Sequence, residues 1–429
     1  MSRSRGEHRT RRRVTRSLLG AALLTSLLVL LLRGFALPVR DLPPPTGAYP
    51  VTTLVWDLAD PARREDYARG PEDPARRTIR VQLWLPAAGP GDGASTGRLP
   101  WMLDGPAQTR AIVQTHGFPP VIWAHTDRMD SWSRPVPGIG GPEGLRAHLQ
   151  KLTRDGHLPA GGPPVALIIH GWEGYRALHA DIAEELASRG FLVAAADHSY
   201  GAAATVLSDG RVIRSGADIL PDRGEPGFAG QATRLVATFA ADARLMLDQL
   251  QSLGATGPVS VIGHSTGGGA AVQLALEDER VSRLVGLDAW VEPLGSRRLT
   301  RERLDIPTLL LRSAEWEGGI NDRYLLPFVA AHGDEAPVRL FQIDGITHEQ
   351  FSTLYMYAPA AQWVGFLGPA DPMAAGRLQI ELVSSFVDGP GAQPRWPTPR
   401  RLSPELVVSP IVPNSSTAAP VQAVAGKAQ

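Results

Sequence analysis

Regularly spaced apolar runs after residue 165 constrain the fold of this chain more than any other feature. The runs at 165–170, 191–196, 258–262, 283–287, 308–312 and 339–343 are short and apolar, which is typical of buried strands. Segments with helical spacing lie among them, at 177–188, 234–253, 270–276 and 378–386. Strands that alternate with helices favour a parallel sheet covered on both faces. We therefore expect an α/β fold with a mostly parallel central sheet and helices on both faces.

The remaining segments predict the domain boundaries. A proline-rich spacer at 38–48 precedes two opening strands, at 51–56 and 78–85, so we expect one folded domain over 49–390. Residues 100–164 combine many prolines with helical patches. We expect them to form an insertion in that domain and not a second domain. Residues 391–429 are rich in Pro, Ser and Ala, which predicts a disordered tail.

Residues 1–37 have the pattern of a targeting segment. Arginines cluster in the first 16 residues, and an apolar run from Leu18 to Leu32 follows them. A basic region before an apolar run is typical of an export signal, which is either cleaved or retained as a membrane anchor. The run is shorter than the roughly 20 residues that cross a bilayer. In both cases we expect the rest of the chain outside the cytoplasm, periplasmic or extracellular, with membrane contact only through this segment.

The composition narrows the possible chemistry. The chain has no cysteine, which excludes disulfides, thiolate zinc sites, iron–sulfur clusters and cysteine nucleophiles. Its 43 basic and 43 acidic residues balance, so no net field attracts nucleic acid. The nucleotide motif G-x-x-x-x-G-K-S/T and the zinc motif H-E-x-x-H are absent. We expect catalysis by hydroxyl, imidazole and carboxylate groups, with no cofactor and no metal.

The motif G-x-S-x-G occurs twice, around Ser265 and around Ser95. The copy at Ser265 follows an apolar run and precedes a helical segment, as a strand-to-helix turn with an exposed serine requires. Its glycines, Gly263 and Gly267, remove side chains that would clash in that turn. The copy at Ser95 lies in a loop rich in proline and glycine, with no strand before it and no helix after it. Ser265 is therefore the predicted nucleophile.

A serine hydroxyl needs a histidine base, which in this kind of fold follows the serine and the acid along the chain. The histidines after Ser265 are His332 and His348. His348 follows the last predicted strand directly, where a loop can reach over the sheet. His332 precedes that strand and has the position of a helix-end residue. We predict His348 as the base.

The acid has several candidates. Asp288 ends the predicted strand at 283–287, whereas Glu315, Glu317 and Asp322 follow the next strand, at 308–312. Both places suit an acid that orients the histidine. Position alone does not choose between them.

The oxyanion hole of this kind of site takes one N–H from the residue after the nucleophile, here Thr266. The second comes from a loop after an earlier strand, often one that carries His-Gly. The sequence His170-Gly171 follows such a strand, so the predicted second donor is the N–H of Trp172. A competing His-Gly pair, His116-Gly117, is followed by two prolines and no predicted helix.

Residues 46–386 resemble the secreted platelet-activating factor acetylhydrolases and their bacterial relatives. The resemblance is carried by the stretches at 46–51, 81–86, 169–171, 190–198, 277–280 and 287–294. Asp288-Ala289-Trp290 is the specific signature, because the family takes its acid there. The resemblance thus implies Ser265, Asp288 and His348 as the catalytic triad.

The same resemblance implies a function. The family hydrolyses short acyl esters without calcium, in its best-known members at the middle carbon of a phospholipid. We therefore expect a serine ester hydrolase that cleaves short-acyl carboxylic esters through an acyl-enzyme. This chain departs from the family pattern at Trp172–Gly174 and at Thr266, beside the expected acyl pocket. A broad carboxylesterase or polyester hydrolase is thus an alternative, and a non-catalytic surface-binding protein on the same scaffold is another.

Overall fold

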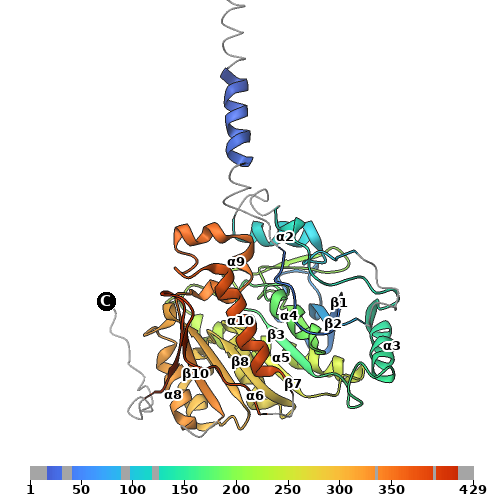
Figure 1. The fold of residues 1–429 in the computed structure, drawn as a ribbon, viewed down its shortest axis with the longest axis vertical. Coiled ribbons are helices and arrows are strands. Elements are labelled where there is room, and N and C mark those ends of the chain that lie inside the picture. The colour runs from blue at the N-terminus through green and yellow to red at the C-terminus, as the bar shows by residue number, and fades with distance from the viewer. Residues whose placement is uncertain are drawn as a thin grey trace, which may run out of the picture.

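The computed structural model describes residues 17–30, 41–87, 97–117, 125–333, 337–389 and 393–413. A ten-stranded sheet in the order β1-β2-β4-β3-β7-β8-β9-β10-β12-β11 runs through these residues (Figure 1). Its strands are β1 (Val51–Arg64), β2 (Arg76–Pro86), β3 (Val165–Ile169), β4 (Leu192–Asp197), β7 (Val259–His264), β8 (Val281–Leu287), β9 (Thr308–Ser313), β10 (Val338–Asp344), β11 (Arg400–Arg401) and β12 (Val407–Ile411). A separate hairpin pairs β5 (Ala204–Val206) with β6 (Val212–Arg214).

The centre of the sheet is parallel. Strands β4, β3, β7, β8, β9 and β10 pair in parallel, each with its neighbour in that order. The pairs β1–β2 and β2–β4 at one edge and β10–β12 and β11–β12 at the other are antiparallel. The expectation of a mostly parallel central sheet is confirmed. The carboxyl ends of the parallel strands all lie at the same end of the sheet, which is where ligands bind in open α/β sheets.

Helices cover both faces of the sheet, as expected. They are α2 (Gly105–Thr115), α3 (Gly141–Arg154), α4 (Ala180–Ser188), α5 (Phe228–Ser252), α6 (Thr266–Glu277), α7 (Ser296–Arg301), α8 (Asp322–His332), α9 (Leu354–Tyr357) and α10 (Pro372–Val387). Short 3₁₀ turns are η3 (Thr126–Arg128), η4 (Glu292–Leu294), η5 (Ala314–Trp316), η6 (His348–Phe351) and η7 (Pro359–Val364). Helices α4 and α10 lie side by side on one face (Figure 1).

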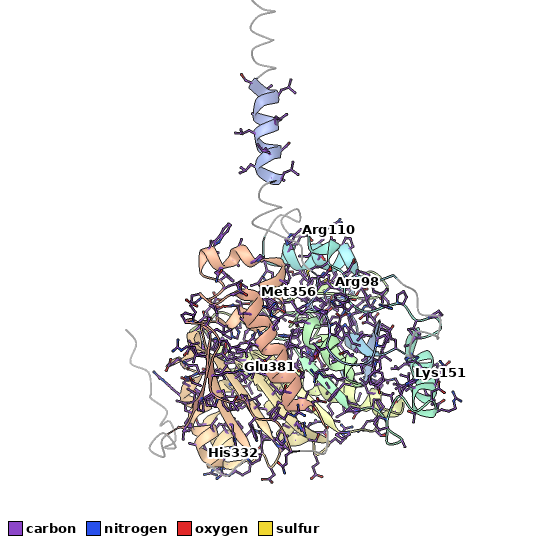
Figure 2. The ribbon with its side chains drawn as sticks, in the orientation of Figure 1. Arg98, Arg110, Lys151, His332, Met356 and Glu381 are labelled. Carbon is purple, nitrogen blue, oxygen red and sulfur yellow. The ribbon has the colours of Figure 1, made fainter. Side chains whose placement is uncertain are left out.

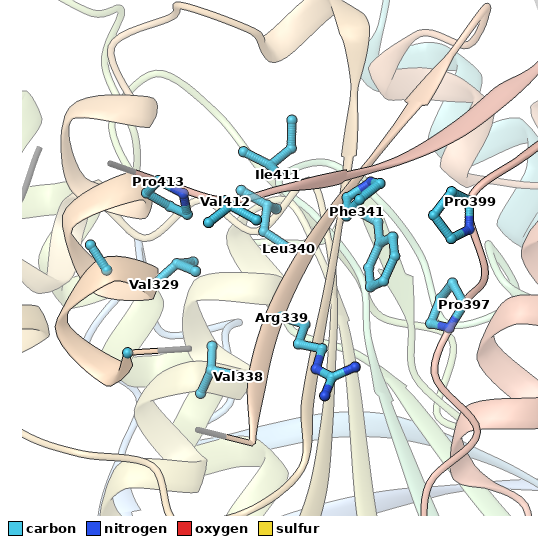
Figure 3. Close-up of a pocket in the computed structure, with 13 residues that line it drawn as sticks. Val329, Val338, Arg339, Leu340, Phe341, Pro397, Pro399, Ile411, Val412 and Pro413 are labelled. Carbon is cyan, nitrogen blue, oxygen red and sulfur yellow. The ribbon is translucent and has the colours of Figure 1, made fainter. Parts of the chain in front are cut away.

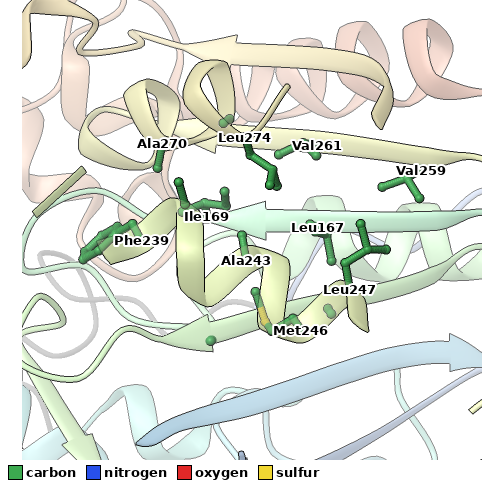
Figure 4. Packing of buried hydrophobic residues seen from close by; sticks show 14 of the residues in the cluster. Leu167, Ile169, Phe239, Ala243, Met246, Leu247, Val259, Val261, Ala270 and Leu274 are labelled. Carbon is green, nitrogen blue, oxygen red and sulfur yellow. The ribbon is translucent and has the colours of Figure 1, made fainter. Parts of the chain in front are cut away.

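Alternate residues of a strand point to opposite faces, and β3 shows how this builds two cores. Leu167 and Ile169 belong to a cluster with α3, α5, α6, α7 and α8. Ala166 and Ile168 belong to a second cluster with α2, α4, α9 and α10. Figure 4 shows the first cluster, in which Phe239 and Met246 of α5 reach toward β3 and β7. Because β3 is apolar on both sides, it has to lie inside the sheet.

The prediction of a disordered tail over 391–429 is wrong for the described part of that region. Strand β12 pairs antiparallel with β10, and β11 pairs with β12. Leu406 and Val408 are buried in the second cluster. The physical reason is that β10 would otherwise present an unpaired edge, and β12 supplies the backbone groups that pair with it. Residues 414–429 lie outside the described residues.

The expected domain start near residue 49 is too late, because part of the proline-rich spacer is packed. Leu42 is buried and its carbonyl accepts a hydrogen bond from Trp132 Nε1 at 2.7 Å. The Thr46 hydroxyl and N–H donate to Glu185 of α4. Specific polar contacts of this kind cannot be predicted from proline content.

The segment expected as an insertion, 100–164, supplies α2 and α3, and both pack on the main cores. Ala111 and Ile112 of α2 belong to the second cluster, and Leu145 and Leu149 of α3 to the first. Within the expected targeting segment, residues 17–30 form a helix, and residues 1–16 and 31–40 are outside the described residues. Among the described helices, none combines the length and apolarity needed to cross a bilayer.

Candidate active site

Ser265 occupies a strained turn between β7 and α6. Its φ is +55° and its ψ is −121°, a conformation that side-chain-bearing residues rarely adopt. The turn is held because Ser265 N–H donates to Leu287 O and Trp290 N–H donates to Ser265 O, both at 2.9 Å. Strain that the surrounding structure over-determines in this way is typical of functional sites.

The flanking glycines are required by close backbone contacts. A Cβ on Gly263 would lie 2.2 Å from Gly267 O, and a Cβ on Gly267 would lie 2.1 Å from Ile169 O. Such distances are far below van der Waals contact, so any side chain there would displace the turn. The backbone contacts of this turn therefore require glycine at both positions.

Asp288 and His348 lie 60 positions apart in the sequence and are brought together by the fold. Asp288 directly follows β8, has φ +42° and is buried, and His348 begins η6 after β10. His348 Nδ1 lies 3.0 Å from Asp288 Oδ2. Ser313, at the end of β9, donates its N–H and hydroxyl to the same carboxylate, at 2.7 and 2.6 Å. The carboxylate is thus held by three hydrogen bonds from two residues.

Three further residues contact His348. Glu315 Oε2 accepts a hydrogen bond from His348 N–H at 2.7 Å. The indole of Trp316 stacks on the imidazole, with ring centroids 4.5 Å apart and 12° between the planes. The ring of His264, the residue before Ser265, lies on another side, with centroids 4.6 Å apart. These contacts set the imidazole beside the serine turn.

The surroundings of His348 raise its pKa above the ordinary value. Burial by itself would lower the pKa, but the hydrogen bond to Asp288 and the charge of that carboxylate oppose it. The charges of Glu349 and Glu315 act in the same direction as Asp288. The balance favours the imidazolium form, which is the form that a base has after it takes a proton.

Among the hydrogen bonds of the described residues, none joins Ser265 Oγ to His348 Nε2. The bond between nucleophile and base is often long before substrate binds. The structure therefore places the two groups in one region without closing the contact between them.

The predicted oxyanion donors lie at Ser265 as well. A Cβ on Gly171 would lie 2.9 Å from Ser265 Cβ and 3.4 Å from its Oγ, so the loop that carries Trp172 passes directly beside Ser265. Thr266 is the first residue of α6, where backbone N–H groups have no partner within the helix. No carbonyl of the described residues accepts a hydrogen bond from the N–H of Trp172.

The other carboxylates that the sequence left open have structural contacts. Asp322 pairs with the buried Arg312, and Glu317 accepts a hydrogen bond from Gln342 at 3.1 Å. Neither is bonded to His348, whereas Glu315 contacts only its backbone N–H. Sequence position did not show which of these carboxylates meets the histidine. In the structure, Asp288 is the one hydrogen-bonded to the His348 ring.

The other two histidines that the sequence offered, His332 as a base and His116 in a second His-Gly pair, do not contact Asp288. His332 ends α8, accepts a hydrogen bond from Leu304 N–H at 3.0 Å, and lies at the opposite end of the domain from Met356 of α9 (Figure 2). His116 lies 3.5 Å from Glu173 and so borders the loop of Trp172 instead of forming a second one. Ser95 lies outside the described residues.

Sequence reasoning missed Ser313 and Trp316. Strands β8 and β9 are parallel neighbours, with Leu287 opposite Leu311. The carboxyl ends of the two strands therefore meet, which would have indicated Ser313 as a partner of Asp288 if the strand register had been known. Trp316 gave no signal, because stacking on a loop histidine depends on tertiary structure alone.

A cavity formed by described residues lies away from this site. It has a volume of about 820 Å³ and lies beside β10 and the segment after β12, with Phe341, Pro397 and Ile411 in its wall (Figure 3). Ser265, Asp288 and His348 are not among its lining residues. Within the described part of the chain, no cluster of three or more His, Asp or Glu side chains could hold a metal ion.

A serine on a strained strand-to-helix turn, with a histidine–aspartate pair beside it at the end of a parallel sheet, defines the α/β-hydrolase class. The solved structure of a ferulic acid esterase from Streptomyces cinnamoneus has the same fold. It superposes with a TM-score of 0.62, covering 83% of this chain and 95% of that chain at 22% identity.

Within this class, the chain is similar to the platelet-activating factor acetylhydrolases. The family model "Platelet-activating factor acetylhydrolase, isoform II" matches residues 230–389, and that of the dienelactone hydrolase family matches residues 157–290. The platelet-activating factor acetylhydrolase of Bos taurus is 27% identical over 35% of this chain and 42% of its own length. The platelet-activating factor acetylhydrolase of Cavia porcellus is 25% identical over 44% of this chain and 48% of its own length. The chain thus spans less than half the length of these curated relatives.

Proposed function

We propose that this protein is a serine ester hydrolase that cleaves short-acyl carboxylic esters by a two-step acyl transfer. The observation that carries the proposal is the hydrogen bond between Asp288 and His348 Nδ1 beside the strained Ser265. A carboxylate can only accept, so Nδ1 carries a proton and the neutral ring has its lone pair on Nε2. Nε2 is the atom that can take the serine proton.

In the first step, Ser265 Oγ attacks the ester carbonyl carbon while its proton passes to His348 Nε2. The negative charge that develops on the carbonyl oxygen is stabilised by the N–H groups of Thr266 and Trp172. His348 then gives the proton to the leaving alkoxide, the bond between carbon and alkoxide oxygen breaks, and an acyl-enzyme remains.

In the second step, water replaces the alcohol. His348 takes a proton from water, the hydroxide oxygen bonds to the acyl carbon, and the serine oxygen leaves with the proton returned from His348. The products are the carboxylic acid and the free enzyme. Asp288 stays ionised throughout and stabilises the imidazolium of each step.

The short acyl group is supported by the names of the curated relatives and by the sequence signature around Asp288. A broad carboxylesterase or polyester hydrolase is the second candidate. The observation that favours it is the bulky, acidic pair Trp172 and Glu173, whose side chains are only partly buried and which follow Gly171, the residue beside Ser265. This loop would alter the shape of the acyl pocket.

Two measurements test the proposal. A fluorophosphonate probe should label the folded wild type and should not label Ser265→Ala. Hydrolysis of p-nitrophenyl acetate, butyrate and octanoate, an acetylated phospholipid and a polyester film then ranks the substrates. We expect the acetate and the acetylated phospholipid to be cleaved fastest. An unlabelled wild type, or equal labelling of Ser265→Ala, would reject the enzyme and leave a binding protein on this scaffold.

We also propose that the N-terminal segment directs export. The proposal rests on the arginine cluster followed by the apolar run, part of which forms the helix at 17–30. N-terminal sequencing of the protein recovered from each cell fraction separates a cleaved signal from a retained anchor. Recovery of the uncleaved chain in the cytoplasm would reject export.

A further inference from the structure

A buried histidine lies directly behind the loop that carries Trp172. His170 Nδ1 is 2.6 Å from the carbonyl oxygen of Gly171, and the N–H of Gly174 donates to the same oxygen at 3.0 Å. His170 is 2% exposed, and its ring packs edge-on against Phe239 with centroids 5.5 Å apart. The proposed triad does not use this histidine.

The protonation of His170 follows from its partners. Its Nε2 lies 3.3 Å from the backbone N–H of His198. A backbone N–H can only donate, so Nε2 must accept, and a neutral ring then carries its proton on Nδ1. Burial and the neighbouring His198 hold the pKa of His170 well below the ordinary value, which keeps the ring neutral. His170 Nδ1–H therefore donates to the Gly171 carbonyl.

A buried ion-pair network fixes His198 in turn. His198 Nδ1 lies 3.0 Å from Asp242 Oδ2, and its ring stacks on Phe239 with centroids 4.2 Å apart. Asp242 pairs with Arg77 at 2.5 Å, and both side chains are almost fully buried. The His198 N–H that sets the tautomer of His170 is thus held by a rigid part of the core.

The carbonyl of Gly171 and the N–H of Trp172 belong to the same peptide group. That group is planar, so a bond that fixes the direction of the C=O also fixes the direction of the N–H. Hydrogen bonds in a chain polarise one another, so a peptide whose carbonyl accepts two bonds has a stronger N–H donor. Both effects act at the oxyanion site, where a donor is most effective when it is oriented in advance.

We infer that His170 is a positioning residue that orients and polarises the Trp172 N–H for the oxyanion of an ester substrate. This inference rests on the proposed ester hydrolysis. In the pair His170-Gly171, the histidine side chain thus donates a hydrogen bond to the carbonyl oxygen of the glycine. It also explains Gly174, where a Cβ would lie 3.0 Å from both Gly171 O and His170 Nδ1.

The test compares His170→Asn with His170→Leu. The two replacements have nearly the same shape, and both lose Nε2, but only the asparagine keeps a donor near the Nδ1 position. In His170→Leu we expect kcat for p-nitrophenyl acetate to fall about 10–100-fold, part of the roughly 10²–10³ that a whole oxyanion donor supplies, with KM nearly unchanged. Asparagine should restore most of that loss. Binding of a trifluoromethyl ketone, which forms an oxyanion with the serine, should weaken in parallel with kcat.

Equal kcat in the two variants, or a loss confined to KM, would overturn the inference while leaving the proposed hydrolysis intact. An inactive wild type would instead reject the hydrolysis itself. Thermal melting checks that each variant folds. If the leucine does not fold, His170→Gln replaces it as the comparison, because its amide lies one carbon further out, near the former Nε2. Asparagine should then exceed glutamine in kcat, and the reverse order would count against the inference.

Discussion

The imidazole of His348 lies flat against the indole of Trp316, with 12° between the two ring planes and 4.5 Å between their centroids. The face of an indole attracts a cation, so this contact favours the protonated imidazole. It also restricts rotation of the ring around the hydrogen bond to Asp288. Trp316 is therefore expected to contribute both to the basicity and to the orientation of the base.

Replacing Trp316 by leucine should lower kcat about 3–30-fold and move the acid limb of the pH–rate profile to lower pH, since a cation–π contact is worth about 0.5–2 kcal/mol. The measurement is kcat/KM for a p-nitrophenyl ester between about pH 5 and 9, an interval that includes the pH range where histidine titrates. The exposed Trp363 provides the control, and Trp363→Leu should leave the profile unchanged. An unshifted acid limb in Trp316→Leu would argue against this role.

The raised pKa of His348 predicts a pH dependence with a definite sign. The base must be neutral, so activity should fall as pH drops through a midpoint above the ordinary value of 6.5. Removing the Asp288 charge leaves burial as the main effect on the pKa, so Asp288→Asn should move the midpoint below 6.5 and cut kcat by about 10⁴.

The pH dependence of stability has the opposite sign to that of activity. The His348–Asp288 pair stabilises the fold below the unfolded pKa and loses that contribution as pH rises through the folded pKa.

Glu315 should have a smaller effect than Asp288, because it accepts a bond from the backbone N–H of His348 and not from the ring. Glu315→Gln keeps an acceptor oxygen and should retain kcat within about 3-fold, whereas Glu315→Ala should lose about 3–10-fold through looser positioning of the histidine loop. Steady-state kinetics of the two variants beside Asp288→Asn checks this order. Near-normal turnover in Asp288→Asn with abolished turnover in Glu315→Gln would identify Glu315 as the acid.

Gly267→Ala should abolish activity and destabilise the fold by roughly 1–3 kcal/mol or more, because its Cβ would overlap Ile169 O at 2.1 Å. Gly230, near the start of α5, is the matched control, since nothing lies within 4 Å of its Cβ position. Gly230→Ala should keep full activity and the same or slightly higher stability. Urea unfolding and esterase assays on both variants measure the two effects.

The C-terminal strands should contribute to stability. Leu406 is 1% exposed beside β12, whereas Leu402 in the same segment is 47% exposed. Leu406→Ala should lower the free energy of unfolding by about 2–5 kcal/mol, as buried leucine truncations do, and Leu402→Ala by less than about 0.5 kcal/mol. Equal denaturation midpoints for the two variants would mean that the segment adds nothing to the folded core.

The sequence alone determined the parallel centre of the sheet and the serine turn, because both are local patterns. The apolar runs that became β3, β7 and β8 are buried on both faces, which continuous hydrophobicity predicts. The turn at Ser265 was predictable because its glycines are required within a few residues of the serine. Strands β11 and β12 were missed, since strands of two and five residues have too little pattern to separate them from a loop.

Only the tertiary structure decided which carboxylate meets His348 and what holds it there. Asp288 and Glu315 follow neighbouring strands, so both arrive at the same edge of the sheet and the sequence could not rank them without a family resemblance. Strand register and the strained backbone of Asp288 bring its carboxylate to the imidazole, whereas Glu315 reaches the backbone N–H. Asp288 and His348 are 60 positions apart, and a hydrogen bond between them depends on a distance set to tenths of an ångström. The order of residues does not specify that distance. The packing of two strands and a loop does.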